Sequence, residues 1–344
     1  MILRNKIYFL ICLIITLLNV SVVFAGRADK AGTSAASELL IPVGARLIGL
    51  GSASIANVDG LEAIYLNPAG LSSLNSQYGV MFSHMTYIAD INVEYLAAAV
   101  KLSSFGYFGV SIKSLDVGDI KITTEDQPDG TGEVTSPTFM IIGGTFSRQI
   151  SDRISVGLSA NYIYEKMARV SASGIGFNLG VQYNGIGGID GLSVGAAVKN
   201  IGSSIKFDGT GLLREASIND VSRSSSIVKI ESASSDLPST IEVGLGYDAK
   251  INDANDILFV STFQNNDYSA DEYKFGVEYI YNNLLSLRGG MMISPTTPNE
   301  YLFGPSMGIG VNYDATFGKI SVDYSYRAVK YFSGNHIFSV IFKF

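Results

Sequence analysis

The stretch ISVDYSYRA, residues 320–328, decides which class of fold this sequence adopts. Its apolar and aromatic side chains alternate with polar ones, in the order Ile320, Ser321, Val322, Asp323, Tyr324, Ser325, Tyr326, Arg327 and Ala328. Because successive residues of a β-strand point to opposite faces, the stretch forms a ribbon with one apolar and one polar face. In a water-soluble sheet the apolar face covers a core, whereas in an outer-membrane barrel it contacts lipid and the polar face lines the lumen.

The same alternation recurs along the chain in segments of about ten residues, the length that a tilted strand needs to cross a bilayer. In TIEVGLGYDAK, residues 240–250, an apolar face alternates with a face of glycines and charged residues. About fourteen such segments begin near Tyr78, Asn92, Gly106, Thr138, Arg153, Ile175, Leu192, Thr240, Asp256, Tyr273, Leu284, Ser306, Lys319 and His336. An even number returns the chain to its starting side, as single-chain bacterial barrels require.

The links between these segments differ in length according to their order. Links after even-numbered segments are short, whereas three links after odd-numbered segments are long, at residues 114–137, 203–239 and 294–305. Outer-membrane barrels have short periplasmic turns and longer outer loops. The pattern therefore favours an all-β, transmembrane outer-membrane barrel of about 14 antiparallel strands over the alternative, a soluble sandwich. In the second long link, GLLREASI (residues 211–218) is expected to form either a small amphipathic helix over a pocket or a protein-docking surface.

The polar faces of the segments are rich in glycine and serine and carry scattered charges. Those that we expect to face the lumen are Glu242, Glu278, Arg288, Asp314, Asp323 and Arg327. In lipid each would cost several kcal/mol at mid-depth, whereas in the lumen it can find a partner. The small residues beside them leave room for a plug inside the barrel.

The N-terminus predicts export. Residues 1–25 combine a basic start, an apolar run and a small-x-small site ending at Ala25, which is typical of a cleaved signal peptide. A retained membrane anchor is the alternative, because the apolar run approaches the length of a spanning helix. The one cysteine, Cys12, lies in this run, so the mature chain has no disulfide. The predicted location is the outer membrane of a Gram-negative-type bacterium, as a multi-pass barrel.

Composition and motifs argue against several function classes. The net charge of −7 and the lack of a basic run argue against nucleic-acid binding. Catalysis would need a nucleophile with a base, and the best candidates are the two histidines, His84 and His336, with Ser83 and Ser333 beside them. Single histidines at a barrel rim are usually just solvated, so we predict no enzyme activity. Metal-ligand spacings are missing, and we predict no metal and no cofactor.

Residues 26–77 break the alternation and precede the first strand. Asp59 is placed to cap a short helix over residues 60–66. Asn67 is pushed out of helical geometry by Pro68, and Gly70 can take a left-handed termination. A capped helix followed by a turn explains this segment without any ligand.

This segment also carries a family resemblance. Gly44-Ala45-Arg46, Gly49, Gly51, Asp59 and the motif Asn67-Pro68-Ala69-Gly70-Leu71 resemble the N-terminal signature of the PorV/PorQ branch of the FadL-type outer-membrane proteins. The C-terminal Phe344 is similar to the terminal signature of such barrels. The resemblance implies a hatch over residues 26–77 that plugs a fourteen-stranded barrel over residues 78–344, with Asp59, Asn67, Pro68, Ala69 and Gly70 in the hatch. Leu66 departs from the pattern, since many relatives have an aromatic residue there.

The resemblance leaves two functions open. The PorV/PorQ likeness implies a non-enzymatic accessory of type IX protein secretion, with exported proteins or secretion components as partners at the cell surface. The wider FadL likeness implies a passive transporter of hydrophobic small molecules, such as long-chain fatty acids. In both, the protein sits in outer-membrane lipid, and the sequence favours the first through its glycine-arginine opening.

Overall fold

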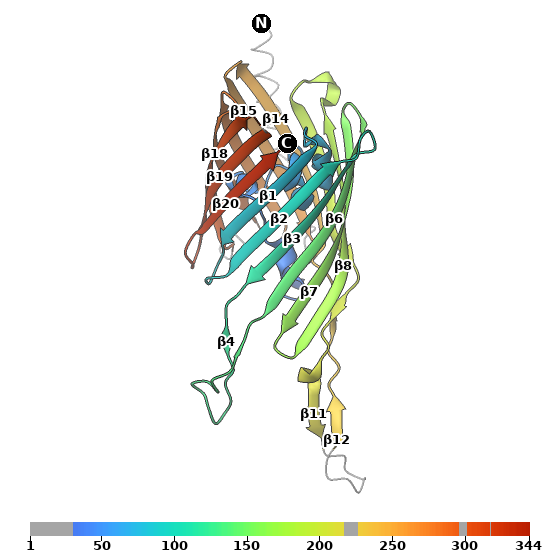
Figure 1. Cartoon of the computed structure of the whole chain (residues 1–344), viewed down its shortest axis with the longest axis vertical. Coiled ribbons are helices and arrows are strands. Elements are labelled where there is room, and N and C mark those ends of the chain that lie inside the picture. The colour runs from blue at the N-terminus through green and yellow to red at the C-terminus, as the bar shows by residue number, and fades with distance from the viewer. Residues whose placement is uncertain (1–29, 217–225, 296–300, 317) are drawn as a thin grey trace.

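The computed structural model describes residues 30–216, 226–295, 301–316 and 318–344, so the predicted signal peptide lies outside the described residues. Fourteen antiparallel strands form a closed barrel (Figure 1). They are β1 (Tyr78–Thr86), β2 (Asn92–Lys101), β3 (Tyr107–Asp116), β6 (Thr138–Ser151), β7 (Ile154–Met167), β8 (Val170–Asn184), β9 (Leu192–Gly202), β14 (Thr240–Asn252), β15 (Asn255–Asn266), β16 (Glu272–Tyr281), β17 (Leu285–Ile293), β18 (Phe303–Ala315), β19 (Gly318–Val329) and β20 (Asn335–Lys343). The barrel closes where β1 pairs with β20.

Strand β19, which contains the stretch ISVDYSYRA, answers the question of which face is inside. Val322 is 50% exposed on the outer face, whereas Asp323 is 4% and Arg327 1% exposed. The other strands repeat this pattern, with large apolar side chains exposed outward and polar ones buried within the ring. Such an outer surface needs lipid rather than water around it. The expected transmembrane, outer-membrane-type barrel is therefore confirmed.

The described parts of the long links lie at one end of the barrel, which we call the loop end, and the short turns lie at the other, the turn end. Small two-stranded ribbons extend the first two long links, and ribbons from both project beyond the barrel (Figure 1). They pair β4 (Ile120–Lys121) with β5 (Val134–Thr135), β10 (Ile205–Lys206) with β13 (Ser234–Ser235), and β11 (Leu213–Ala216) with β12 (Ser226–Lys229). A helix over GLLREASI is wrong for residues 213–216, because cross-strand pairing holds them extended after η6 (Thr210–Leu212). A further short turn, η5 (Ile186–Gly188), joins β8 to β9.

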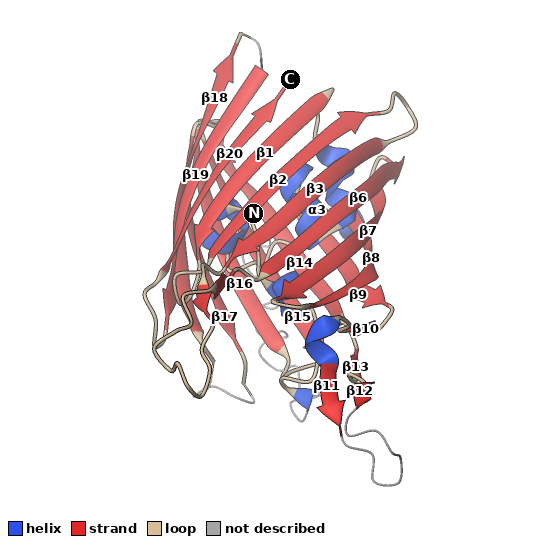
Figure 2. Ribbon diagram, turned by 60° about the horizontal axis from the view of Figure 1, so that its bottom comes forward, coloured by secondary structure: helices blue, strands red, loops and turns tan. Residues whose placement is uncertain are grey.

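The described residues before β1, from residue 30 on, fold mostly inside the barrel as a plug of short helical turns (Figure 2). Its elements are η2 (Ser37–Leu40), α2 (Ala45–Gly49), η3 (Gly60–Glu62), α3 (Ala63–Leu66) and η4 (Pro68–Ser73). Most side chains between residues 43 and 74 are buried, and they form clusters with inward-facing residues of the wall. Among the described residues, no helix has both the length and the hydropathy to cross a membrane.

Glycines on the inner wall let the plug come close. A Cβ atom added at Gly246 of β14 would overlap the side-chain amide of Asn57 in the plug. At Gly180 of β8 it would overlap the amide of Asn67. The glycine-rich polar faces seen in the sequence are therefore the surfaces on which the plug rests.

Candidate functional site

A cavity of about 500 Å³ lies at the loop end, between the plug and the wall. On the plug side it is lined by a strap, residues 37–42, together with Ser52, Tyr65 and Leu66, and its wall has two contrasting sectors. The apolar sector, from the β1–β2 link, β3 and β6, consists of Tyr87, Ile88, Ile91, Leu115, Val117 and Phe139. The polar sector, from the opposite side of the ring, consists of Lys199, Asn200, Thr240, Glu242, Gln264, Glu272 and Lys274. The volume suits a small organic molecule.

The charges of the polar sector pair with one another. The Nζ of Lys199 on β9 lies 3.1 Å from the Oε1 of Glu242 on β14. The Nζ of Lys274 on β16 lies 3.8 Å from carboxylate oxygens of both Glu242 and Glu272. Two lysines thus face two glutamates, and this sector is neutral as a whole.

The strap is fixed from below by the plug and the wall. The hydroxyl of Tyr65 donates to the carbonyl oxygen of Leu40 at 3.1 Å, and the Nζ of Lys113 donates to the carbonyl oxygen of Ile41 at 2.5 Å. Glu38 of the strap is buried, and this burial, together with the neighbouring carboxylate of Glu165, raises its pKa to about 8. The strap is therefore held at the edge of the cavity by specific polar contacts.

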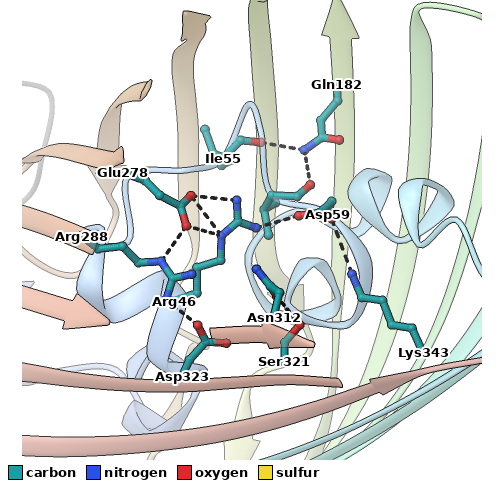
Figure 3. Close-up of polar contacts among 11 residues, drawn as sticks. Arg46, Ile55, Asp59, Gln182, Glu278, Arg288, Asn312, Ser321, Asp323 and Lys343 are labelled. Carbon is teal, nitrogen blue, oxygen red and sulfur yellow. Dashed lines mark hydrogen bonds and ion pairs between the residues drawn. The ribbon is translucent and has the colours of Figure 1, made fainter. Parts of the chain in front are cut away.

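A second group of charges ties the plug to the wall near the turn end (Figure 3). The guanidinium of Arg46, on α2, donates to Asp59 at 2.7 Å and to Glu278 of β16 at 3.0 Å. Arg288 of β17 donates to the same Glu278 at 2.7 Å and to Asp323 of β19 at 2.5 Å. A polar cavity of about 170 Å³ adjoins these residues. Since four of its charges come from different elements, this network holds α2 against three strands.

Two plug carboxyl groups in this region have pKa values shifted in opposite directions. Burial tends to raise the pKa of Asp59, but the cations of Lys343 and Arg46 outweigh it, and the net pKa is lowered. Burial raises the pKa of Glu62 to about 7, although Arg46 opposes the shift. The Oε1 atom of Glu62 is buried and has no hydrogen-bond partner among the described residues. Of these two carboxyl groups, Glu62 is therefore the one whose pKa lies close to neutral pH.

The hatch motif is structural. The Nδ2 of Asn67, which is fully buried, donates to the carbonyl oxygens of Ile55 at 2.9 Å and Val181 at 3.1 Å, and its Oδ1 accepts from the amide of Ala69 at 3.2 Å. Pro68 begins η4, and the carbonyl oxygen of Ala69 accepts from Ser147 of β6. These contacts connect η4 to the wall.

Two expectations about this motif are wrong. Asp59 makes no capping hydrogen bond to the turn η3, because its carboxylate is drawn instead to Arg46. Gly70 does not adopt a left-handed conformation and lies within η4. A side chain there would overlap the carbonyl oxygen of Val58, so the position needs glycine for close approach rather than for backbone freedom.

The structure sorts the charges that we predicted in the lumen into two groups. Glu278, Arg288 and Asp323 form the plug network, whereas Glu242 and Arg327 border the loop-end cavity. Asp314 belongs to neither group, because it is exposed near the end of β18. The sequence indicated the inward direction of these residues but could not pair them, since their partners come from strands far apart in the chain.

The two histidines lie on the outer face. His84 contacts Glu94 through Nδ1 at 2.6 Å, and His336 contacts the hydroxyl of Tyr324 at 2.8 Å. Ser83 points inward, where it accepts from Ser339 at 3.0 Å. Ser83 and His84 therefore face opposite sides of the wall and cannot act together. Nowhere in the described ranges do three or more potential metal ligands gather.

Comparisons with known proteins bear on the fold. Among solved structures, the chain is similar to the toluene transporter TodX of Pseudomonas putida, with a TM-score of 0.55 and 14% sequence identity, covering 88% of this chain and 98% of that one. The deltaS2S3 mutant of TodX, a monoaromatic hydrocarbon channel, gives a TM-score of 0.54 at 14% identity, with 88% and 99% covered. No protein-family model and no curated protein matches the chain. The chain therefore shares the barrel fold of these proteins over 88% of its length.

Proposed function

We propose that this protein is a non-enzymatic outer-membrane channel that binds small hydrophobic or amphipathic molecules in its loop-end cavity and passes them inward when the plug moves. The observation that carries the proposal is the cavity of about 500 Å³, which has an apolar sector and is bordered by the plug. The fold shared with TodX, a toluene transporter, supports the same class of solute. This is the FadL-like alternative of the two functions that the sequence left open.

The cavity itself provides the test. Val117 belongs to the apolar sector, and a Val117→Trp substitution would fill part of the cavity. Val110 faces outward and is 48% exposed, so Val110→Trp is a matched control that adds the same bulk toward lipid. We expect Val117→Trp to slow the uptake of a neutral aromatic probe such as naphthalene several-fold, and Val110→Trp to leave it unchanged. Uptake by producing cells, compared with cells that lack the protein, measures this.

Equal uptake by both variants would count against a route through the cavity. The secretion role implied by the PorV/PorQ likeness stays a prediction, which no comparison supports. It predicts that exported proteins co-purify with this barrel from outer membranes. A pull-down analysed by mass spectrometry for both proteins and lipids would separate the two functions.

A further inference from the structure

We propose that the solute of the loop-end cavity is a small organic anion with an aromatic body, and that Arg327 is the residue that selects it. This inference rests on the proposed function, because it names the class of solute for the same cavity. It follows from one charge that the cavity leaves uncompensated and from the aromatic side chains around that charge.

Arg327 is a buried cation with neutral partners. It lies on β19, lines the cavity and is 1% exposed. Its Nε and Nη2 donate to the Oδ1 of Asn335 at 3.0 Å and 2.8 Å, and its guanidinium lies 3.9 Å from the ring centre of Phe303. Within the part of the chain that the structure describes, no carboxylate oxygen comes within 4.0 Å of this guanidinium.

The other cations of the cavity wall differ in this respect. Lys199 and Lys274 each have a carboxylate within 4.0 Å, so the polar sector is already neutral. Arg327 therefore adds one positive charge with no carboxylate of the described residues within 4.0 Å. Glu272 acts on it only from farther away, and the raised pKa of Glu38 favours the neutral form of that carboxyl group. An uncompensated buried charge is strongly unfavourable, and a guanidinium binds a carboxylate through two parallel N–H donors. A ligand with one anionic group would supply the missing partner.

Aromatic side chains surround this position. The ring centres of Tyr87 and Phe303 are 6.2 Å apart, and those of Tyr301 and Phe303 are 6.4 Å apart in an edge arrangement. All three residues line the cavity beside Arg327. Aromatic rings at such spacings favour edge and offset contacts with another ring. A rigid aromatic body also loses less conformational freedom on binding than a flexible chain does.

The experiment uses four probes and the full-length protein in nanodiscs of zwitterionic lipid. The probes are 4-phenylbutanoate, its uncharged amide 4-phenylbutanamide, butylbenzene, and decanoate, which are matched in carbon number. Equilibrium dialysis measures their affinities. Because charge-assisted hydrogen bonds are strong, we expect the wild type to bind 4-phenylbutanoate at least about tenfold more tightly than the amide.

Substitutions then test whether Arg327 causes the preference for the anion and Tyr301 the preference for the aromatic ring. We expect Arg327→Gln to lower the affinity for 4-phenylbutanoate about tenfold or more. The affinity for butylbenzene should not change, which would show that the cavity is intact. Arg148→Gln removes an exposed arginine of β6 and is expected to change nothing. Tyr301→Leu should lower the ratio of 4-phenylbutanoate to decanoate affinity several-fold.

Each contrary result has a definite meaning. Equal binding of the acid and the amide by the wild type overturns the anion assignment even if Arg327→Gln does not fold. Unchanged binding of 4-phenylbutanoate by a folded Arg327→Gln protein overturns the role of Arg327. An unchanged ratio in Tyr301→Leu overturns the aromatic assignment. Failure of the wild type to bind any probe, butylbenzene included, overturns the proposed function itself.

Discussion

At the scale of single residues, two buried polar side chains of the plug differ in how fully their hydrogen-bonding atoms are satisfied. Asn67 uses its whole amide to hold the plug together, whereas Glu62 is buried with one oxygen unsatisfied. A buried carboxyl group without a full set of partners favours its protonated form. Near the turn end, Glu62 is therefore the plug residue whose protonation should change with pH.

We predict that docking of the plug weakens as the pH rises from about 4.5 to about 7 and that Glu62 causes part of this change. The ordinary pKa of this carboxyl is 4.5 and its value in the docked plug is about 7. The stabilisation of the docked plug by protonated Glu62 is fully present below pH 4.5. It is lost as the pH rises through about 7, and above that pH Glu62 no longer makes docking depend on pH. The size of this stabilisation is about 3 kcal/mol, from about 1.4 kcal/mol per unit of pKa.

The Glu62→Gln variant tests this, because the amide has no charge to lose. Hydrogen exchange of the plug amides at residues 44–66, corrected for intrinsic rates, should depend less on pH in the variant than in the wild type. Arg46 and Asp59 on the plug, with Arg288 and Asp323 on the wall, surround Glu62 in both proteins. The same pH dependence in wild type and variant would show that other groups are responsible.

At the scale of elements, the plug and the wall fit because one side lacks side chains. The side chain of Asn57 packs against Gly246, and that of Asn67 packs against Gly180. The polar face of each strand thus forms a surface against which the plug packs. The alternation of glycine with apolar residues in the sequence indicated this open face. It could not indicate which plug residue meets which glycine, because that depends on the tilt and register of strands that pair around the whole ring.

We predict that a disulfide between Asn57→Cys and Gly246→Cys fastens the plug to the wall. The two positions are in contact, and beyond residue 25 the sequence has no other cysteine to interfere. If solutes pass when the plug moves, the oxidised variant should still bind butylbenzene but should lose uptake of naphthalene, and a reducing agent should restore it. The Asn57→Cys single variant is the control. Full uptake by the oxidised double variant would show that the plug need not move.

At the scale of the whole molecule, the barrel has two unlike ends. The long links and the 500 Å³ cavity share the loop end, while the plug network lies toward the turn end. Because outer-membrane barrels carry their longer loops outside, the cavity should open toward the exterior. Solutes would then meet the cavity first and the plug second.

We predict that a protease site inserted between β4 and β5, near Asp126, is cut on intact cells. These residues are exposed in a link that projects from the loop end. The same site inserted between Asp253 and Ala254, in a turn at the opposite end, should be cut only after the outer membrane is permeabilised. The reverse pattern of cleavage would show that the barrel has the opposite orientation, with the cavity on the periplasmic side.

The sequence by itself determined the barrel and its polarity. The period of two, the segment length and the sorting of link lengths are local features, and they located all fourteen strands to within about five residues of their observed starts. What the tertiary structure decided is which inward residues meet. Arg46 and Glu278 are 232 positions apart, and among the described residues Arg327 has no carboxylate within 4.0 Å, whereas Glu242 and Glu272 lie close to lysines of the cavity wall. Pairing of charges in a lumen depends on the three-dimensional closure of the sheet, for which a linear alternation of residues carries no signal.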